Sequence, residues 1–146
     1  MGTPGSRERI TVVRCRSWPV IGLGRRNDEL AAVFVANRVV AASAAAVQAG
    51  VAVGLRRREA QRRAPALEVL APDIGAEVRA FEPVLRSMEA VTPRIEIDRP
   101  GACSFLTRGP SRYFGGDEAM SDRVAEVVAA ELGGRTTVHV LSLIHI

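Results

Sequence analysis

Five arginines that lie close together in the chain are the residues whose type and spacing point most clearly to chemistry. They are Arg56, Arg57, Arg58, Arg62 and Arg63. A guanidinium group keeps its charge near neutral pH and gives paired hydrogen bonds to phosphate oxygens. Residues 58 and 62 are one helical turn apart, so at least part of the set shares a helix face. The pattern predicts sequence-independent contact with DNA phosphates or with an acidic partner; a solvated arginine-rich helix is the alternative.

Other sequence patterns that bind nucleotides or metals are incomplete. Gly22 and Gly24 follow a predicted strand, but the third glycine of a dinucleotide fingerprint would fall at Asn27. The chain has no lysine, so it has no Walker-type phosphate loop. His139 has no Cys or acidic partner nearby and is expected to be a packing or surface residue. We therefore expect no catalytic residues, no metal site and no cofactor.

Composition places the chain among globular proteins with one basic half. Its 146 residues are 47% hydrophobic, which suits a single domain with a real core. Residues 1–63 contain 12 Arg and 4 acidic residues, whereas residues 64–146 contain 8 Arg and 12 acidic residues. The basic half suggests one face that attracts phosphates. Cys15 and Cys103 are expected to be reduced buried thiols of a cytoplasmic protein, and no apolar run is long enough to span a membrane.

Hydrophobic periodicity predicts a mixed order of strands and helices around the arginines. Strands are expected at 9–15, 29–36, 38–42, 68–70, 94–98, 102–106 and 136–140. Helices are expected after Ser43, across the arginines, at 74–91 and at 117–132, with a Gly- and Pro-rich loop at 108–116. In the helix at 74–91, the apolar stripe is predicted to be Val78, Phe81, Leu85 and Met88. This order predicts an α/β (α+β) sandwich with a ferredoxin-like sheet and a small helical insertion.

The segment around the arginines resembles the palm-to-fingers region of Y-family (UmuC/DinB-like) DNA polymerases. A strand ends at Ser43, the turn Gly50-Val51-Ala52-Val53-Gly54-Leu55 follows, and the basic helix leads to Ala64-Pro65-Ala66-Leu67. A narrower resemblance is to the ImuB-type proteins, non-catalytic relatives of these polymerases in bacterial damage-induced (SOS) mutagenesis. It rests on Trp18-Pro19, on residues 37–43 and 57–61, and on Tyr113-Phe114-Gly115-Gly116. The resemblance spans about residues 10–140 and implies a palm sheet with a fingers insertion at about 44–70.

The resemblance also aligns this chain with the groups that such polymerases use for chemistry. Nucleotidyl transfer needs metal ions held by carboxylates. Arg14 and Arg16 align with the two aspartates of the first strand, and Gly101 and Ala102 align with the later acidic pair. The Tyr and Arg that grip the triphosphate align with Ala44 and Val47.

The resemblance therefore implies a protein without polymerase chemistry, a DNA-associated docking platform for translesion synthesis in the cytoplasm, at the nucleoid. The implied partners are DNA, a sliding clamp, a RecA-like accessory protein and an error-prone replicative-type polymerase, with no membrane. Two alternatives stay open: an active but diverged Y-family translesion polymerase, and a generic basic α/β module that binds nucleic acid.

The two ends of the chain are expected to lie outside the folded unit. Residues 1–8 are short, polar and Gly/Pro-bearing and are expected to be a disordered tail. Residues 141–146 resemble the translation of an adapter sequence used in DNA library preparation. We therefore expect an artefactual, poorly packed tail after a short edge strand, and a natural protein that continues beyond about Val140.

Overall fold

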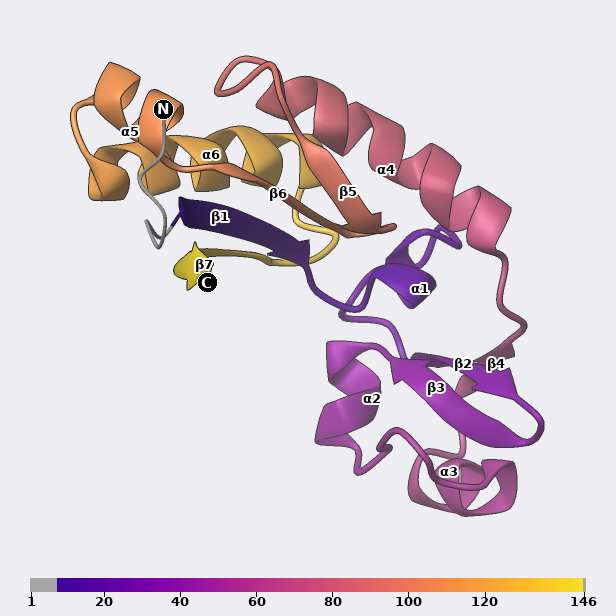
Figure 1. The fold of residues 1–146 in the computed structure, drawn as a ribbon. Coiled ribbons are helices and arrows are strands. Elements are labelled where there is room, and N and C mark those ends of the chain that lie inside the picture. Colours follow the sequence, from indigo (N-terminus) through magenta and orange to yellow (C-terminus); the bar gives the residue numbers. More distant parts are fainter. Residues whose placement is uncertain (1–7, 146) are drawn as a thin grey trace.

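A four-stranded antiparallel sheet in the order β5-β6-β1-β7 forms the larger of two units in this computed structural model, which describes residues 8–145 (Figure 1). β1 (Glu8–Cys15) lies between β6 (Ala102–Leu106) and β7 (Val138–His145), and β5 (Glu96–Arg99) forms the edge next to β6. β5 and β6 form a hairpin with a bulge between Ile97 and Arg99. The strands expected at 9–15, 94–98 and 102–106 therefore lie in one sheet, as a ferredoxin-like sheet requires.

Helices cover only one face of this sheet. They are α4 (Ile74–Met88), α5 (Arg108–Phe114) and α6 (Asp117–Leu132), on the same side of the strands in Figure 1. Alternation along β1 sends Val13 and Cys15 into a core shared with Phe81 of α4 and Val124 of α6. Residues 10, 12 and 14 therefore point to the opposite, uncovered face of the sheet.

The smaller unit contains a second sheet in the order β3-β2-β4, with α2 and α3 beside it (Figure 1). Its elements are β2 (Ala31–Val35), β3 (Arg38–Ala42), α2 (Ala44–Gln48), α3 (Arg57–Arg63) and β4 (Glu68–Leu70). The β2–β3 hairpin turns at Ala36 and Asn37, whose φ angles of 50° and 62° suit a two-residue turn. β2 and β3 lie before residue 44, so this unit is larger than the insertion expected at 44–70, and its equivalence to the fingers stays a prediction.

Hydrogen bonds connect the two units at the end of β1. The short helix α1 (Trp18–Ile21) follows β1, and the indole Nε1 of Trp18 donates to the Glu77 carbonyl of α4 at 3.0 Å. Ser17 Oγ donates to the Ala42 carbonyl of β3 at 3.1 Å. The backbone N–H of Asn27 donates to the Arg135 carbonyl at 2.8 Å. These bonds fix the smaller unit against the end of the larger sheet.

The buried stripe of α4 differs from the predicted one. Its buried residues are Glu77, Phe81, Val84 and Met88, whereas Val78 is 46% exposed. The predicted burial of Phe81 and Met88 is confirmed, but the predicted burial of Val78 is wrong. Apolar residues at 74, 78, 81, 84, 85 and 88 allow two overlapping helical stripes, and packing against α6 selects the one that contains Val84. The helix also ends at Met88, before the predicted Val91.

The loop expected at 108–116 contains the helix α5 instead. Gly109 and Pro110 suggested a loop, but both lie in the first turn of α5, where a proline has no intrahelical hydrogen bond to lose. The helix ends at Gly115, whose φ of 87° is left-handed. The prediction of a loop was therefore wrong for most of this segment.

Both expected tails also need correction. Glu8 begins β1, and the rest of the expected tail, residues 1–7, lies outside the described residues. β7 does not stop at Val140 but pairs with β1 through His145, in the register Glu8↔His145 to Cys15↔Val138. Residues 141–145 thus continue the edge strand that was expected to end at about Val140, although Leu141 and Leu143 leave about half of their surface exposed.

Candidate nucleic-acid interface

Four of the five arginines lie on α3, and Arg56 precedes it as the extended N-cap residue, at the end of the smaller unit that is farthest from the larger sheet (Figure 1). Two alanines fix the helix: Ala60 and Ala64 are 0% and 2% exposed and pack into a core with Phe34 and Val39. The backbone N–H of Arg57 donates to the Asn37 carbonyl of the β2–β3 turn at 2.8 Å. Small buried residues thus hold a short helix close to its sheet while its long side chains remain outside.

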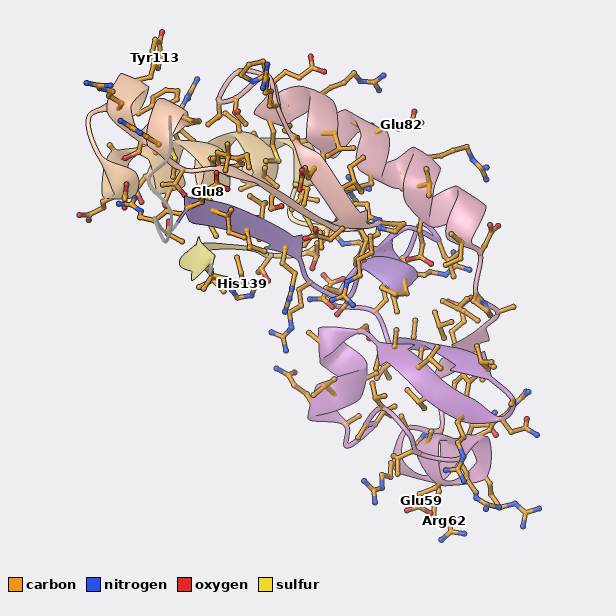
Figure 2. All side chains as sticks on the ribbon, in the orientation of Figure 1. Glu8, Glu59, Arg62, Glu82, Tyr113 and His139 are labelled. Carbon is orange, nitrogen blue, oxygen red and sulfur yellow. The ribbon has the colours of Figure 1, made fainter. Side chains whose placement is uncertain are left out.

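All five predicted arginines are exposed, but they fall into two groups. Glu59 forms ion pairs with Arg62 at 3.4 Å and with Arg63 at 3.2 Å, and Arg63 also donates to the Gly50 carbonyl at 2.9 Å. Figure 2 shows Glu59 and Arg62 together at this outer end of the molecule. Arg56, Arg57 and Arg58 form no ion pair within residues 8–145. These three guanidinium groups are the ones available to an external anion.

Arg38 joins this surface and was missed in the sequence. It forms a β-bridge with Arg56, and its guanidinium donates to the Gly54 carbonyl at 2.9 Å. The feature of the sequence that could have identified Arg38 is its position at the start of a predicted strand, directly after a tight turn. Only the return of the chain to that strand through Gly50 and Gly54 brings the two arginines together, and this pairing is not local in sequence.

A second set of positions singled out in the sequence meets on the uncovered face of the larger sheet. Arg14 is in register with Ala102 of β6 on one side and with His139 of β7 on the other. Arg16 follows β1, is exposed, and its backbone N–H donates to the Thr137 carbonyl at 3.0 Å. The first-strand and hairpin positions that the resemblance aligned with acidic groups are therefore neighbours in space. His139 is exposed, which selects the surface role from the two that were expected.

Gly101, the other residue that aligns with the later acidic pair, lies in the turn next to Trp18 and not in the row of Ala102. Its φ is 90°, and a Cβ at this position would lie 2.3 Å from Trp18 Cβ. A side chain of any size therefore cannot be accommodated there without movement of the tryptophan. The Gly101 carbonyl accepts a hydrogen bond from the Cys15 N–H at 2.8 Å, which ties the turn of the β5–β6 hairpin to the end of β1.

The positions aligned with the triphosphate-gripping residues, Ala44 and Val47, both lie on α2. Ser43 caps this helix by accepting a hydrogen bond from the Ala46 N–H at 3.1 Å. The Ala44 N–H donates to Asn27 Oδ1 at 2.7 Å, so the first turn of the helix is held from the connection between the units. Val47 is 50% exposed. Neither side chain offers a charged or hydrogen-bonding group.

The titratable groups of the larger unit form no cluster suited to metal binding. Among residues 8–145, no group of three or more His, Cys, Asp or Glu side chains could hold a metal ion. Cys15 and Cys103 are free and buried, as predicted, and burial raises the pKa of each thiol to about 12. A thiol with such a pKa stays protonated and is a poor nucleophile.

A hollow of about 820 Å³ opens on the uncovered face, toward the end of the sheet away from the smaller unit. Glu8 and Ile10 of β1, Ser104 and Leu106 of β6, and the segment 92–95 before β5 contribute to its walls. Its walls combine apolar side chains with the carboxylates of Glu8 and Glu96 and the guanidinium of Arg94. This mixed lining gives no single ligand chemistry.

Comparison with known families decides the affiliation. A sequence model of the impB/mucB/samB family matches residues 14–140, which include both units. The chain belongs to the impB/mucB/samB family. No curated protein matches it in sequence.

Solved structures share the fold of this family member. A Y-family DNA polymerase chimera of Dbh and Dpo4 superposes with a TM-score of 0.68 at 14% identity, over 92% of this chain and 42% of that one. DinB from Sulfolobus solfataricus gives a TM-score of 0.67 at 14% identity, with the same coverage. A Dbh ternary complex gives 0.72 at 16% identity, over 92% and 41%. The predicted α/β fold of the Y-family polymerase type is thus confirmed, and the chain spans about two fifths of the length of these polymerases.

One expectation from the sequence is overturned by these comparisons. The chain was expected not to be an enzyme, because Arg14, Arg16, Gly101 and Ala102 align with acidic positions. The family and its structural neighbours are Y-family DNA polymerases, which are enzymes. Four substituted positions in a chain that covers 42% of such a polymerase are no evidence of inactivation.

Within residues 8–145, none of the helices has the length and apolar content needed to span a bilayer.

Proposed function

We propose that this chain is the palm and fingers part of a protein that handles DNA in damage tolerance by translesion synthesis, and that α3 contacts the DNA backbone. The observation that carries the proposal is the group Arg56, Arg57 and Arg58. These residues are exposed, form no ion pair within the described residues, and lie at the N-cap and in the first turn of a helix that Ala60 and Ala64 anchor. Membership in the impB/mucB/samB family supports the connection with DNA.

Guanidinium groups of this kind suit phosphates better than bases. Contacts to phosphate oxygens position a protein on DNA but carry no sequence information. Each phosphate that an arginine neutralises releases counterions and adds about 0.9 to the salt slope of duplex binding. Arg62 and Arg63 share Glu59, so part of their charge is already compensated, and we expect them to contribute less.

Fluorescence anisotropy with a labelled primer–template duplex tests this proposal. The triple variant R56Q/R57Q/R58Q removes the three unpaired charges and keeps the buried alanines of α3. We expect weaker binding and a salt slope that is lower by roughly two to three units. The matched control R79Q/R86Q/R112Q removes three exposed arginines from the helices of the larger unit. Equal affinities and equal salt slopes for the two triple variants would overturn the proposal.

A second candidate function is DNA synthesis by the complete protein, which the family membership favours. Primer extension with magnesium by the complete protein measures it. Glu96 of β5 and Asp98 at the bulge of β5 are the carboxylates of this sheet closest in register to Arg14 and Ala102. If the wild-type protein extends the primer and both D98N and E96Q fail to do so, Asp98 and Glu96 are assigned as ligands of the catalytic magnesium ions. If both variants extend the primer as well as the wild type does, neither carboxylate is needed to bind the metal ions.

The narrower resemblance to ImuB-type proteins adds partners and a location to the proposal. The partners are a sliding clamp, a RecA-like accessory protein and an error-prone replicative-type polymerase, and the location is the cytoplasm, at the nucleoid. Size-exclusion chromatography of the complete protein with each purified partner tests each association separately. Separate elution of every pair would remove these partners from the proposal without affecting DNA contact by α3.

A further inference from the structure

One transverse row on the uncovered face of the larger sheet consists of three basic residues and an alanine. Strand register places Arg99 of β5 opposite Ala102, Ala102 opposite Arg14, and Arg14 opposite His139. Residues paired in this way on antiparallel strands project on the same face. The row therefore crosses all four strands as Arg99, Ala102, Arg14 and His139.

The two guanidinium charges of this row, on Arg14 and Arg99, have no carboxylate partner within the row. Arg14, Arg99 and His139 are exposed and form no ion pair among residues 8–145. Along the strands of this sheet, the carboxylates closest to the row in register are Asp98, in the bulge beside Arg99, and Glu96, in the next row opposite Ser104. Both carboxylates lie on β5, at the edge of the sheet, so neither lies between Arg14 on β1 and His139 on β7. Two rows further from the smaller unit the face is apolar, with Leu106 opposite Ile10 and Ile10 opposite Leu143.

The spacing of the row allows its side chains to reach one anion. Adjacent strands lie about 5 Å apart, so the backbones of Arg14 and Arg99 are roughly 10 Å apart across Ala102. Ala102 has no side-chain atoms beyond Cβ that could separate the two guanidinium groups. Arg16 adds a third guanidinium just beyond the end of β1. Several donors of one sign on a rigid sheet favour a compact, multiply charged anion.

We propose that Arg14, Arg99 and His139 form a phosphate-binding site on the sheet, in which guanidinium and imidazole N–H groups contact the phosphate oxygens directly. The phosphate comes either from a free pyrophosphate-type anion or from the DNA backbone. The site deepens the proposed DNA-related function, but it is built from residues of the larger unit. α3 lies at the far end of the smaller unit (Figure 1), so the two surfaces can be tested separately.

Calorimetric titration with inorganic pyrophosphate and anisotropy with an unphosphorylated primer–template duplex test the site in the purified protein. The variant R14Q/R99Q removes both guanidinium groups from exposed positions, and R79Q/R86Q on α4 removes the same charge from the helix-covered side. We expect R14Q/R99Q to lower the affinity for at least one of the two ligands by on the order of tenfold or more. R14K/R99K keeps the charges without the paired hydrogen bonds and should retain part of the affinity. Circular dichroism verifies that each variant is folded.

The combination of results identifies the source of the phosphate. If R14Q/R99Q loses only pyrophosphate binding, the site binds free phosphate anions. If it loses only DNA binding, the site binds the DNA backbone. If it loses both, the site accepts phosphate from both sources. If R14Q/R99Q binds both ligands as tightly as R79Q/R86Q, the inference is wrong. The variant R56Q/R57Q/R58Q should leave pyrophosphate affinity unchanged. An unaltered DNA affinity in that variant would remove α3 from the DNA interface and leave the sheet site standing.

Discussion

The backbone of Gly101 lies against the side chain of Trp18, so close that a Cβ at position 101 would be 2.3 Å from Trp18 Cβ. This contact brings together the turn of the β5–β6 hairpin and the helix that follows β1. Trp18 is 2% exposed, packs edge-to-face on Phe81 at 5.4 Å, and donates to the Glu77 carbonyl. The turn, the end of β1 and α4 are therefore held by one indole, next to the row that contains Arg14 and Ala102.

Replacing Gly101 with alanine should destabilise the protein strongly. An alanine at a φ of 90° is strained by roughly 1–2 kcal/mol, and overlap with Trp18 adds about 1–3 kcal/mol. The matched control is Gly54→Ala, because Gly54 has a φ of 93° and no atom within 4 Å of an added Cβ. Urea unfolding of both variants separates backbone strain from overlap. Equal losses in the two variants would show that Trp18 moves aside at little cost.

Ser43→Ala should cost more than the loss of an ordinary helix cap. Ser43 is 0% exposed, accepts from the N–H groups of Ala46 and Ala31, and donates to the Glu29 carbonyl. Its removal leaves buried backbone groups without partners, at about 1–3 kcal/mol. Asp73→Ala, which removes the exposed cap of α4, should cost about 1 kcal/mol. Denaturant unfolding compares the two, and a smaller loss for Ser43→Ala would contradict the bonds that link α2 to β2.

Val84→Ala should distinguish the observed buried face of α4 from the one predicted in the sequence. Val84 is 0% exposed, and removal of its methyl groups should cost roughly 2 kcal/mol in lost burial and cavity formation. Val78 is 46% exposed, and Val78→Ala should change the free energy of unfolding by only about 0.5 kcal/mol or less. Thermal unfolding of the pair gives the answer. A larger effect at Val78 would support the stripe predicted from periodicity.

Local patterns in the sequence were sufficient for the strands and most helices. Ser43 and Asp73 mark two helix starts by capping, and the bounds of β3, β4, β6 and α6 agree with the predicted ranges. The phase of α4 was not predictable, because its core position 77 is a glutamate and Val78 is apolar. Long-range pairing was also invisible. The register that places Arg14 between Ala102 and His139 depends on segments about 90 and 125 residues away in the chain.

The candidate site was predictable in part for the same reason. The five arginines at and on α3 were found as a local cluster, and all are exposed, although their contact with DNA stays a prediction. Arg38 and Arg99 were missed, since each reaches its surface only through strand pairing with Arg56 or Ala102. The resemblance drew attention to Arg14 as a replaced carboxylate, and the fold shows the basic row to which it belongs.

Glu77 should make the stability of the protein depend on pH, in the opposite sense to an ion-paired acid. It is buried on α4, and burial, followed by the charge of Asp73, raises the pKa of its carboxyl above the usual 4.5. In the pH range between the two pKa values, the folded chain binds more protons at this group than the unfolded chain does. The free energy of unfolding therefore falls as the pH rises through the unfolded value toward the folded one.

Glu77→Gln removes this titration while keeping most of the side-chain volume next to Gly22 and Trp18. We expect the variant to gain stability relative to the wild type at about pH 7 and to lose that advantage at about pH 4, where the wild-type carboxyl is largely protonated. Glu82→Gln on the exposed side of α4 (Figure 2) changes the same charge and should show no such difference between the two pH values. Urea unfolding at both pH values measures the effect. A wild-type protein that gains stability from Glu77 as the pH rises would show that the carboxylate has a favourable partner in the folded state.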